Sequence, residues 1–266
     1  MDHPSSVEPL SAPDGGPSQV IRRGDTIRRP AGAWTGTVHA LLRHLERVGF
    51  TACPTVIGDG IDADGNQVLS YVEGSLVHPH AWSDESVWRV GRMLRDLHVA
   101  TASFRPPADA RWHPWWMHDD GPGSVITHCD AGPWNIIARD GQPVAFIDWE
   151  LAGPADRLDE IAGTAWWNAQ LHDDDVAQRQ NLPDPPARAR QLRLFLDGYE
   201  LPRADRSGLV DRLIEVAIRN CAAEAVQARV TPESVDPSPL WALAWRARAA
   251  SWMIRHRSLL DNAVRA

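Results

Sequence analysis

The sequence contains no lysine, and all 27 of its Lys and Arg residues are arginine. Any cationic contact to a phosphate must therefore come from a planar guanidinium, which binds phosphate well but is larger and less compact than an ammonium group. The glycine-rich G-x-G-x-x-G pattern is also missing, and Gly15-Gly16 is the only glycine pair before the first expected hairpin. The loop that would bind phosphates through its main-chain N–H groups is therefore short in this chain.

Long apolar runs and cysteines are scarce as well. No apolar run approaches the roughly 20 residues of a membrane-spanning helix. The polar residues 1–19 contain no signal-peptide core, so we expect a disordered lead-in over residues 1–18. The three cysteines are widely spaced, which favours reduced thiols in a cytoplasm over a disulfide framework or a zinc site. A net charge of −8 argues against a general nucleic-acid binder. We therefore expect a cytoplasmic protein with neither nucleic acid nor a membrane as its partner, and the oligomeric state stays open.

Residues 128–135 carry the most informative pattern of the chain, reading His-Cys-Asp-Ala-Gly-Pro-Trp-Asn. This is an H-x-D-x-x-x-x-N spacing, and a second segment, residues 146–150, reads Phe-Ile-Asp-Trp-Glu. Phosphoryl transfer to a hydroxyl group needs a carboxylate beside the attacking oxygen and two oxygen ligands for Mg²⁺. Asp130, Asn135 and Asp148 can supply that set from a short piece of chain.

The segment between Asn135 and Asp148 explains how these side chains can meet. Its sequence predicts two strands, residues 136–138 and 143–147, joined by a turn at Asp140-Gly141. A hairpin brings its two ends together, so Asn135 and Asp148 project from the same edge. That edge can hold one hard cation between oxygen ligands.

This combined pattern, which spans residues 125–162, resembles the catalytic loop and metal-binding strand of the aminoglycoside phosphotransferase family, relatives of the choline kinases and protein kinases. The resemblance implies Asp130 as the catalytic base and His128 as a scaffold residue of the catalytic loop. It implies Asn135 and Asp148 as the Mg²⁺ ligands. It also implies a residue that braces the catalytic loop, in the position of Asp159.

The same resemblance implies an α+β, two-lobed, protein-kinase-like fold. A nucleotide-binding lobe of one small antiparallel sheet and one helix is expected over residues 19–73, and a larger, mainly helical lobe for catalysis and acceptor binding over residues 74–266. A Gly24-Asp25 turn and a helical pattern over residues 37–48 fit the smaller lobe. The family places a nucleotide-contacting hinge where the lobes meet, which here corresponds to Ser70, Tyr71, Val72 and Glu73.

One departure from the family concerns the missing lysine. The family expects a Lys on the strand before the first helix, where it touches the nucleotide phosphates and pairs with a helix Glu. The matching strand here offers Arg28 and Arg29, and the helix offers Glu46. Alternation puts the two arginines on opposite faces of the strand, so at most one points into the cleft, and we favour Arg29. The alternative is that both are solvated surface charges.

The acceptor site is the least defined part of the sequence. Glu150 can face either the metal or a substrate amine. Trp166 and Trp167 lie on a predicted helix that starts beside the active site, so we expect one of them to line an acceptor pocket. The acidic run at residues 173–175 is interpreted as a solvated loop. The helical spacing of apolar residues and the prolines that separate these segments predict helices over residues 84–101, 158–171, 187–199, 206–229 and 240–262.

Together these residues predict a kinase that uses Mg²⁺ to move the γ-phosphate of ATP or GTP to a hydroxyl group of a small molecule. The acceptor is expected to be aminoglycoside-like or another hydroxylated metabolite. The alternative is a non-catalytic relative that binds or regulates, which the missing lysine and glycine-rich loop favour. The complete D-x-x-x-x-N…D set favours the enzyme, because clustered carboxylates repel one another and have little use without a cation.

Overall fold

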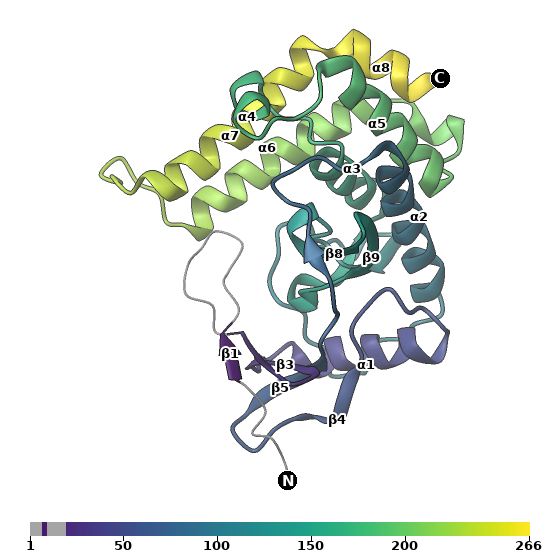
Figure 1. Cartoon of the computed structure of the whole chain (residues 1–266), viewed down its shortest axis with the longest axis vertical. Helices are drawn as coiled ribbons and strands as arrows, with labels where there is room; N and C mark the ends of the chain where they lie inside the picture. Colours follow the sequence, from purple (N-terminus) through teal and green to yellow (C-terminus); the bar gives the residue numbers. More distant parts are fainter. Residues whose placement is uncertain (1–6, 10–19) are drawn as a thin grey trace.

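A five-stranded antiparallel sheet forms the N-terminal lobe of the computed structural model, which describes residues 7–9 and 20–266 (Figure 1). In spatial order its strands are β1 (Val7–Pro9), β2 (Ile21–Arg23), β3 (Thr26–Pro30), β5 (Asn66–Ser70) and β4 (Val56–Ile61). Gly24 takes a positive φ of 61° in the β2–β3 turn, which fits the hairpin prediction. The expected lead-in over residues 1–18 lies outside the described residues except for β1, which pairs with β2.

Helix α1 (Thr35–Arg47) contacts β4 of this sheet and begins two residues before the predicted helix. Leu41, Leu42 and Leu45 are fully buried and belong to the same apolar core that fills the C-terminal lobe. The two lobes therefore share one continuous core, to which α1 of the smaller lobe contributes.

The chain crosses between the lobes at Gly74. Its φ is +144°, and a Cβ atom there would lie 2.4 Å from the backbone oxygen of Ala138, so a glycine is required at this crossing. Strand β6 (Ser75–Leu76) then pairs with β8 (Ile136–Arg139), which pairs with β9 (Gln142–Phe146). The predicted hairpin over residues 136–147 is thus present.

A second, two-stranded sheet pairs β7 (Ser124–Thr127) with β10 (Gly153–Asp156). Strand β10 was not predicted, because Gly-Pro-Ala-Asp has little strand propensity of its own. This pairing places the loop after β7 beside the segment after β9, which is the position of the candidate site.

Helices make up the rest of the larger lobe (Figure 1). They are α2 (Asp84–Thr101), α3 (Arg157–Asn168), α4 (Asp174–Arg179), α5 (Pro185–Tyr199), α6 (Leu209–Gln227), α7 (Pro237–Arg255) and α8 (Arg257–Arg265). Three short 3₁₀ turns accompany them: η1 (Pro133–Asn135), η2 (Trp149–Leu151) and η3 (Arg203–Arg206). The α2 prediction matches residue for residue, whereas the single helix expected over residues 240–262 breaks at His256 into α7 and α8. No helix in the described part of the chain is long and apolar enough to cross a membrane.

Helices α2 and α5 approach each other backbone to backbone. A Cβ atom on Gly91 of α2 would lie 2.1 Å from the backbone oxygen of Phe195, and one on Gly198 of α5 would lie 2.0 Å from that of Trp88. Any side chain beyond hydrogen would therefore force these helices apart.

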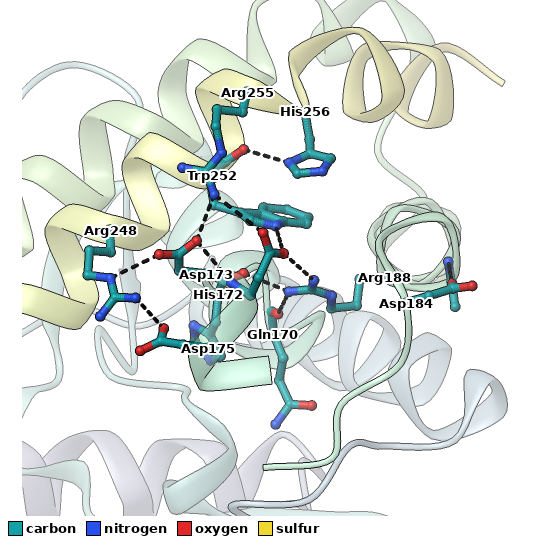
Figure 2. A network of polar contacts seen from close by, with 12 residues as sticks. Gln170, His172, Asp173, Asp175, Asp184, Arg188, Arg248, Trp252, Arg255 and His256 are labelled. Atoms are coloured by element: carbon teal, nitrogen blue, oxygen red, sulfur yellow. Dashed lines mark hydrogen bonds and ion pairs between the residues drawn. The ribbon is translucent and has the colours of Figure 1, made fainter. Parts of the chain in front are cut away.

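The acidic run at residues 173–175 is not a solvated loop, contrary to the sequence interpretation. Asp173 caps the N-terminus of α4 and accepts from Arg248 and Arg255 of α7 at 2.9 and 2.7 Å (Figure 2). Beneath it, the buried Arg188 of α5 stacks on Trp252 of α7, with its guanidinium carbon 4.2 Å from the ring centroid. These contacts fasten α4 and α5 to α7.

Candidate active site

Asp130 lies on the loop after β7, and the following turn η1 holds its carboxylate. Asn135 donates from Nδ2 to Asp130 Oδ2 at 2.7 Å and to the Asp130 backbone oxygen at 3.0 Å. Trp134 Nε1 lies 3.5 Å from the same Oδ2. Burial, and next the charge of Asp148, raise the pKa of Asp130 well above its ordinary value. A carboxylate with a raised pKa is a better acceptor for a hydroxyl proton than an ordinary one.

His128 connects the two halves of the site. Its Nε2 donates to the backbone oxygen of Ile147 at 2.8 Å, and its Nδ1 accepts from the backbone N–H of Asp130 at 3.3 Å. The ring is fully buried, and burial lowers its pKa to about 4, so it is neutral. With both nitrogens engaged and no exposed surface, His128 positions Asp130 and does not itself reach reactants.

Asp148 follows β9 and adopts a left-handed conformation, with φ 62° and ψ 62°. The backbone N–H of Ile147 donates to the oxygen of Asn135 at 2.9 Å, so the two ends of the hairpin meet as its pattern predicts. The side chain of Asp148 is 43% exposed, and its charge acts on Asp130. The structure therefore brings Asp130, Asn135 and Asp148 to one edge.

Arg29 of β3 reaches this edge from the other lobe. Its Nη1 contacts Asp148 Oδ1 and lies 3.6 Å from Glu150 Oε2, while the neighbouring Arg28 pairs with Asp62 at 2.8 Å. The alternation expected along the strand thus selects Arg29. The predicted partner was wrong: Glu46 is exposed in the last turn of α1 and forms an ion pair with neither arginine.

The four junction residues differ in what they can offer a nucleotide. The N–H groups of Ser70 and Tyr71 donate to the oxygens of Thr55 and Asp25, at 2.9 and 2.8 Å, and so are committed to the sheet. The Tyr71 ring lies under the guanidinium of Arg22. The Glu73 oxygen accepts from Arg139 at 2.9 Å. Among the described residues, the main chain of Val72 and the N–H of Glu73 have no partner, so these groups are free to contact a base.

The residue that braces the catalytic loop is Glu160, not Asp159. Glu160 Oε1 accepts from the backbone N–H of Cys129 at 3.1 Å and from Thr127 Oγ1 at 3.3 Å, and burial raises its pKa to about 7. Asp159 instead contacts Arg212 and Arg219 of α6, the latter at 2.6 Å. Successive helix residues face about 100° apart, so an error of one position changes the assigned partner completely.

A cavity of about 280 Å³ opens beside Asp130. Trp134, Trp167 and Glu150 line it, and helices α6 and α7 contribute Asn220, Glu224 and Arg246. Of the two tryptophans of which one was expected here, Trp167 lines the cavity, while Trp166 is fully buried against Trp245. Sequence reasoning missed the residues from α6 and α7, because they lie 90 to 116 residues downstream of Asp130 in the chain and carry no local pattern.

The oxygen ligands present at this edge fit a Mg²⁺ ion. Asn135 uses its amide nitrogen in the contacts with Asp130, which leaves Oδ1 without a partner among the described residues. Amide and carboxylate oxygens are the ligands that Mg²⁺ prefers in proteins. No three His, Cys, Asp or Glu side chains cluster in a way that could hold a metal anywhere in the described ranges, this edge included, so a metal here would depend on the amide oxygen of Asn135. Asn135 and Asp148 are therefore the candidate ligands, with Arg29 sharing the Asp148 carboxylate.

The fold and the site define a phosphotransferase. A model of the phosphotransferase enzyme family matches residues 109–201, which include Asp130, Asn135 and Asp148, and the chain belongs to this family. Over 251 residues it is 51% identical to a trifolitoxin immunity protein from Rhizobium leguminosarum bv. trifolii, covering 94% of this chain and 96% of that protein.

Solved structures share the fold at low sequence identity. An amicoumacin kinase solved with AMP-PNP and Ca²⁺ superposes with a TM-score of 0.67 at 12% identity, over 92% of this chain and 88% of that one. A microcompartment-associated aminopropanol kinase gives 0.66 at 14% identity, over 97% and 94%. The kinase-like fold and the family membership together support a small-molecule phosphotransferase.

Proposed function

We propose that this protein transfers the γ-phosphate of ATP or GTP to a hydroxyl group of a small molecule in the cytoplasm. The observation that carries the proposal is the position of Asp130. Its carboxylate lines the cavity on one side, while its neighbours Asn135 and Asp148 present oxygen ligands on the other. Acceptor and phosphate donor can therefore meet at one carboxylate, which is the arrangement that phosphoryl transfer requires.

Each residue then has one task. Asp130 orients the acceptor hydroxyl and takes its proton. Asn135 and Asp148 hold Mg²⁺, which when bound neutralises charge on the phosphates. The planar fork of Arg29 binds phosphate oxygens in place of the missing lysine. His128 keeps Asp130 in position through its two ring nitrogens.

The acceptor that the relative suggests is a toxin. The relative is named for immunity to trifolitoxin, and 51% identity over nearly the whole chain supports a shared role. We propose that phosphorylation of one hydroxyl group on such a toxin abolishes its action. Immunity would then be the consequence of the transfer reaction.

A second candidate is a protein that binds the toxin without chemistry. The contact of Arg29 with Asp148 favours it, since this contact takes up part of the carboxylate that a metal would need. The absence of lysine and of a glycine-rich loop points the same way. In this version the cavity sequesters the toxin, and Asp130 has no reaction to promote.

Asp130→Asn separates the two candidates. We expect the substitution to lower phosphate transfer to trifolitoxin by about 10²- to 10⁴-fold, the usual contribution of a general base, while nucleotide binding persists. The measurement is mass spectrometry of the toxin after incubation with the protein, Mg²⁺ and ATP or GTP, together with survival of a toxin-sensitive strain that expresses each variant. Asp140→Asn, in the exposed β8–β9 turn, is the matched control. Full protection by Asp130→Asn without any phosphorylated toxin would establish the sequestering protein instead.

A further inference from the structure

Side chains hold the backbone of the loop that carries Asp130, since residues 128–132 belong to neither a strand nor a helix. Three successive carbonyl oxygens of this loop accept hydrogen bonds from side chains: Cys129 from Trp115 at 3.1 Å, Asp130 from Asn135 at 3.0 Å and Ala131 from Asn168 at 2.8 Å. The course of the backbone at Asp130 therefore depends on these side chains.

Asn168 is the last residue of α3, and its side chain is fully buried. Its Nδ2 donates to the backbone oxygens of Ala131 and Thr164, at 2.8 and 2.9 Å. Its Oδ1 accepts from Trp82 Nε1 at 2.9 Å. An indole N–H only donates and a carbonyl oxygen only accepts, so these three partners allow one orientation of the amide group.

Helix α3 thus contacts the loop on both sides of Asp130. Glu160, in the first turn of α3, accepts from the backbone N–H of Cys129 at 3.1 Å. Asn168, at the other end of the helix, donates to the oxygen of Ala131. Ala131 is fully buried, and a buried carbonyl oxygen that loses its donor costs about 1–3 kcal/mol. Without Asn168, the loop would therefore shift toward another partner for this oxygen.

We infer that Asn168 is a positioning residue for Asp130, because it fixes the Ala131 end of the loop as Glu160 fixes the Cys129 end. This inference rests on the proposed phosphotransferase function and adds a residue to its machinery. Since Asn168 is fully buried and bonds to the loop backbone, its effect on the reaction passes through the loop. A displacement of about 1 Å at a reacting group can lower a rate by about 10²-fold.

Two substitutions separate the donors of Asn168 from its acceptor. Asn168→Asp keeps the oxygen that accepts from Trp82 but loses both donors, so the oxygen of Ala131 faces a carboxylate oxygen. Trp82→Phe removes only the indole N–H and keeps both donors of Asn168, which makes it the matched control. Asn168→Ala removes the donors without adding a negative charge near Asp130.

Hydrogen exchange read by mass spectrometry measures how readily the loop opens, on the full chain without nucleotide or acceptor. The N–H groups of Cys129 and Asp130 are bonded to Glu160 and His128, so they report on the loop directly. We expect exchange in residues 126–135 to be at least about tenfold faster in Asn168→Asp and Asn168→Ala than in the wild type. Trp82→Phe should stay within about twofold of the wild type.

The kinetics of phosphate transfer to trifolitoxin provide the second readout. We expect both Asn168 variants to lower kcat by about 10²-fold, while the KM values for toxin and nucleotide stay within about threefold. A loss of overall stability alone would reduce the amount of folded protein, which circular dichroism records, and would leave kcat per folded molecule unchanged.

The wild type alone also tests the contact, should neither Asn168 variant fold. By NMR, we expect the side-chain amide protons of Asn168 to exchange with water at least about 100-fold more slowly than those of the exposed Asn262. Equally rapid exchange would overturn the inference, because an amide bonded to Ala131 and Thr164 is closed to water.

Unchanged exchange of residues 126–135 in the folded Asn168 variants would overturn the inference as well. An equal increase in Trp82→Phe, or an unchanged kcat in the Asn168 variants, would do the same. Faster loop exchange in the Asn168 variants, combined with a wild type that transfers no phosphate, would count against the proposed function alone.

Discussion

At the scale of single residues, Glu160 combines a structural contact with an unusual titration. It is fully buried, its Oε1 holds the catalytic loop, and its Oε2 has no partner among the described residues. Burial raises its pKa from 4.5 to about 7. Between these values the folded state binds more protons than the unfolded state, so the free energy of unfolding falls as pH rises through this window.

Glu160→Gln should remove that dependence. Between about pH 5 and pH 8, we expect the unfolding free energy of the wild type to fall by about 2 to 3 kcal/mol relative to that of the variant. Urea unfolding across this range measures the difference. Glu85→Gln, at an exposed position on α2, is the control and should run parallel to the wild type. Parallel curves for Glu160→Gln would mean that Glu160 keeps its ordinary pKa in the folded protein.

At the scale of elements, the contact between α2 and α5 depends on glycine. We expect Gly91→Ala to cost about 3 kcal/mol of unfolding free energy, because the new methyl group would meet the backbone of α5, which cannot rotate away. Gly36→Ala in α1 meets nothing within 4 Å and should instead stabilise by about 0.5 kcal/mol, through helix propensity alone. Chemical denaturation of both variants tests the contrast. A small loss for Gly91→Ala would show that the helices can separate at little cost.

The elements that the sequence predicted are those whose signals are local. The 136–147 hairpin carries its turn at Asp140-Gly141, and α2 has both a Ser83 cap and a continuous apolar face, so both predictions were correct. Strand β10 forms because it can pair with β7, and no property of its own four residues predicts this pairing. The break at His256 likewise depends on how α8 packs against α5 and η3.

The same distinction between local signals and long-range packing applies to the residues of the candidate site. Asp130, Asn135 and Asp148 lie within 19 residues of one another in the sequence, so their meeting follows from one hairpin. The cavity residues from α6 and α7 meet them only through packing of whole helices. The loop-bracing role was assigned to Asp159 instead of Glu160 for a third reason. Two adjacent acidic residues on a helix are distinguished only by which face of the helix packs inward.

At the scale of the whole molecule, the contact between Arg29 and Asp148 connects the two lobes. A ligand that binds only the folded state at 100 times its Kd adds about 2.7 kcal/mol of stability. For a protein of this size that corresponds to a rise in Tm of roughly 5–10 °C. We therefore expect Mg²⁺ with ATP or GTP to raise the Tm of the wild type by an amount in this range.

The contact between Arg29 and Asp148 predicts that the rise in Tm with nucleotide depends on Arg29 and not on Arg28. Arg29→Ala removes the guanidinium fork that we propose binds the phosphates and should weaken nucleotide binding about tenfold, which halves the rise in Tm at the same nucleotide concentration. Arg28→Ala breaks only the pair with Asp62 on the other face of β3, so it should keep the full rise from a slightly lower starting Tm. Differential scanning fluorimetry on the three proteins, with and without Mg²⁺ and nucleotide, measures both effects.

Equal shifts in the two variants would place Arg29 outside the phosphate site. A wild type that responds to neither nucleotide would favour the sequestering protein over the kinase, since a phosphotransferase must bind its donor before it can act.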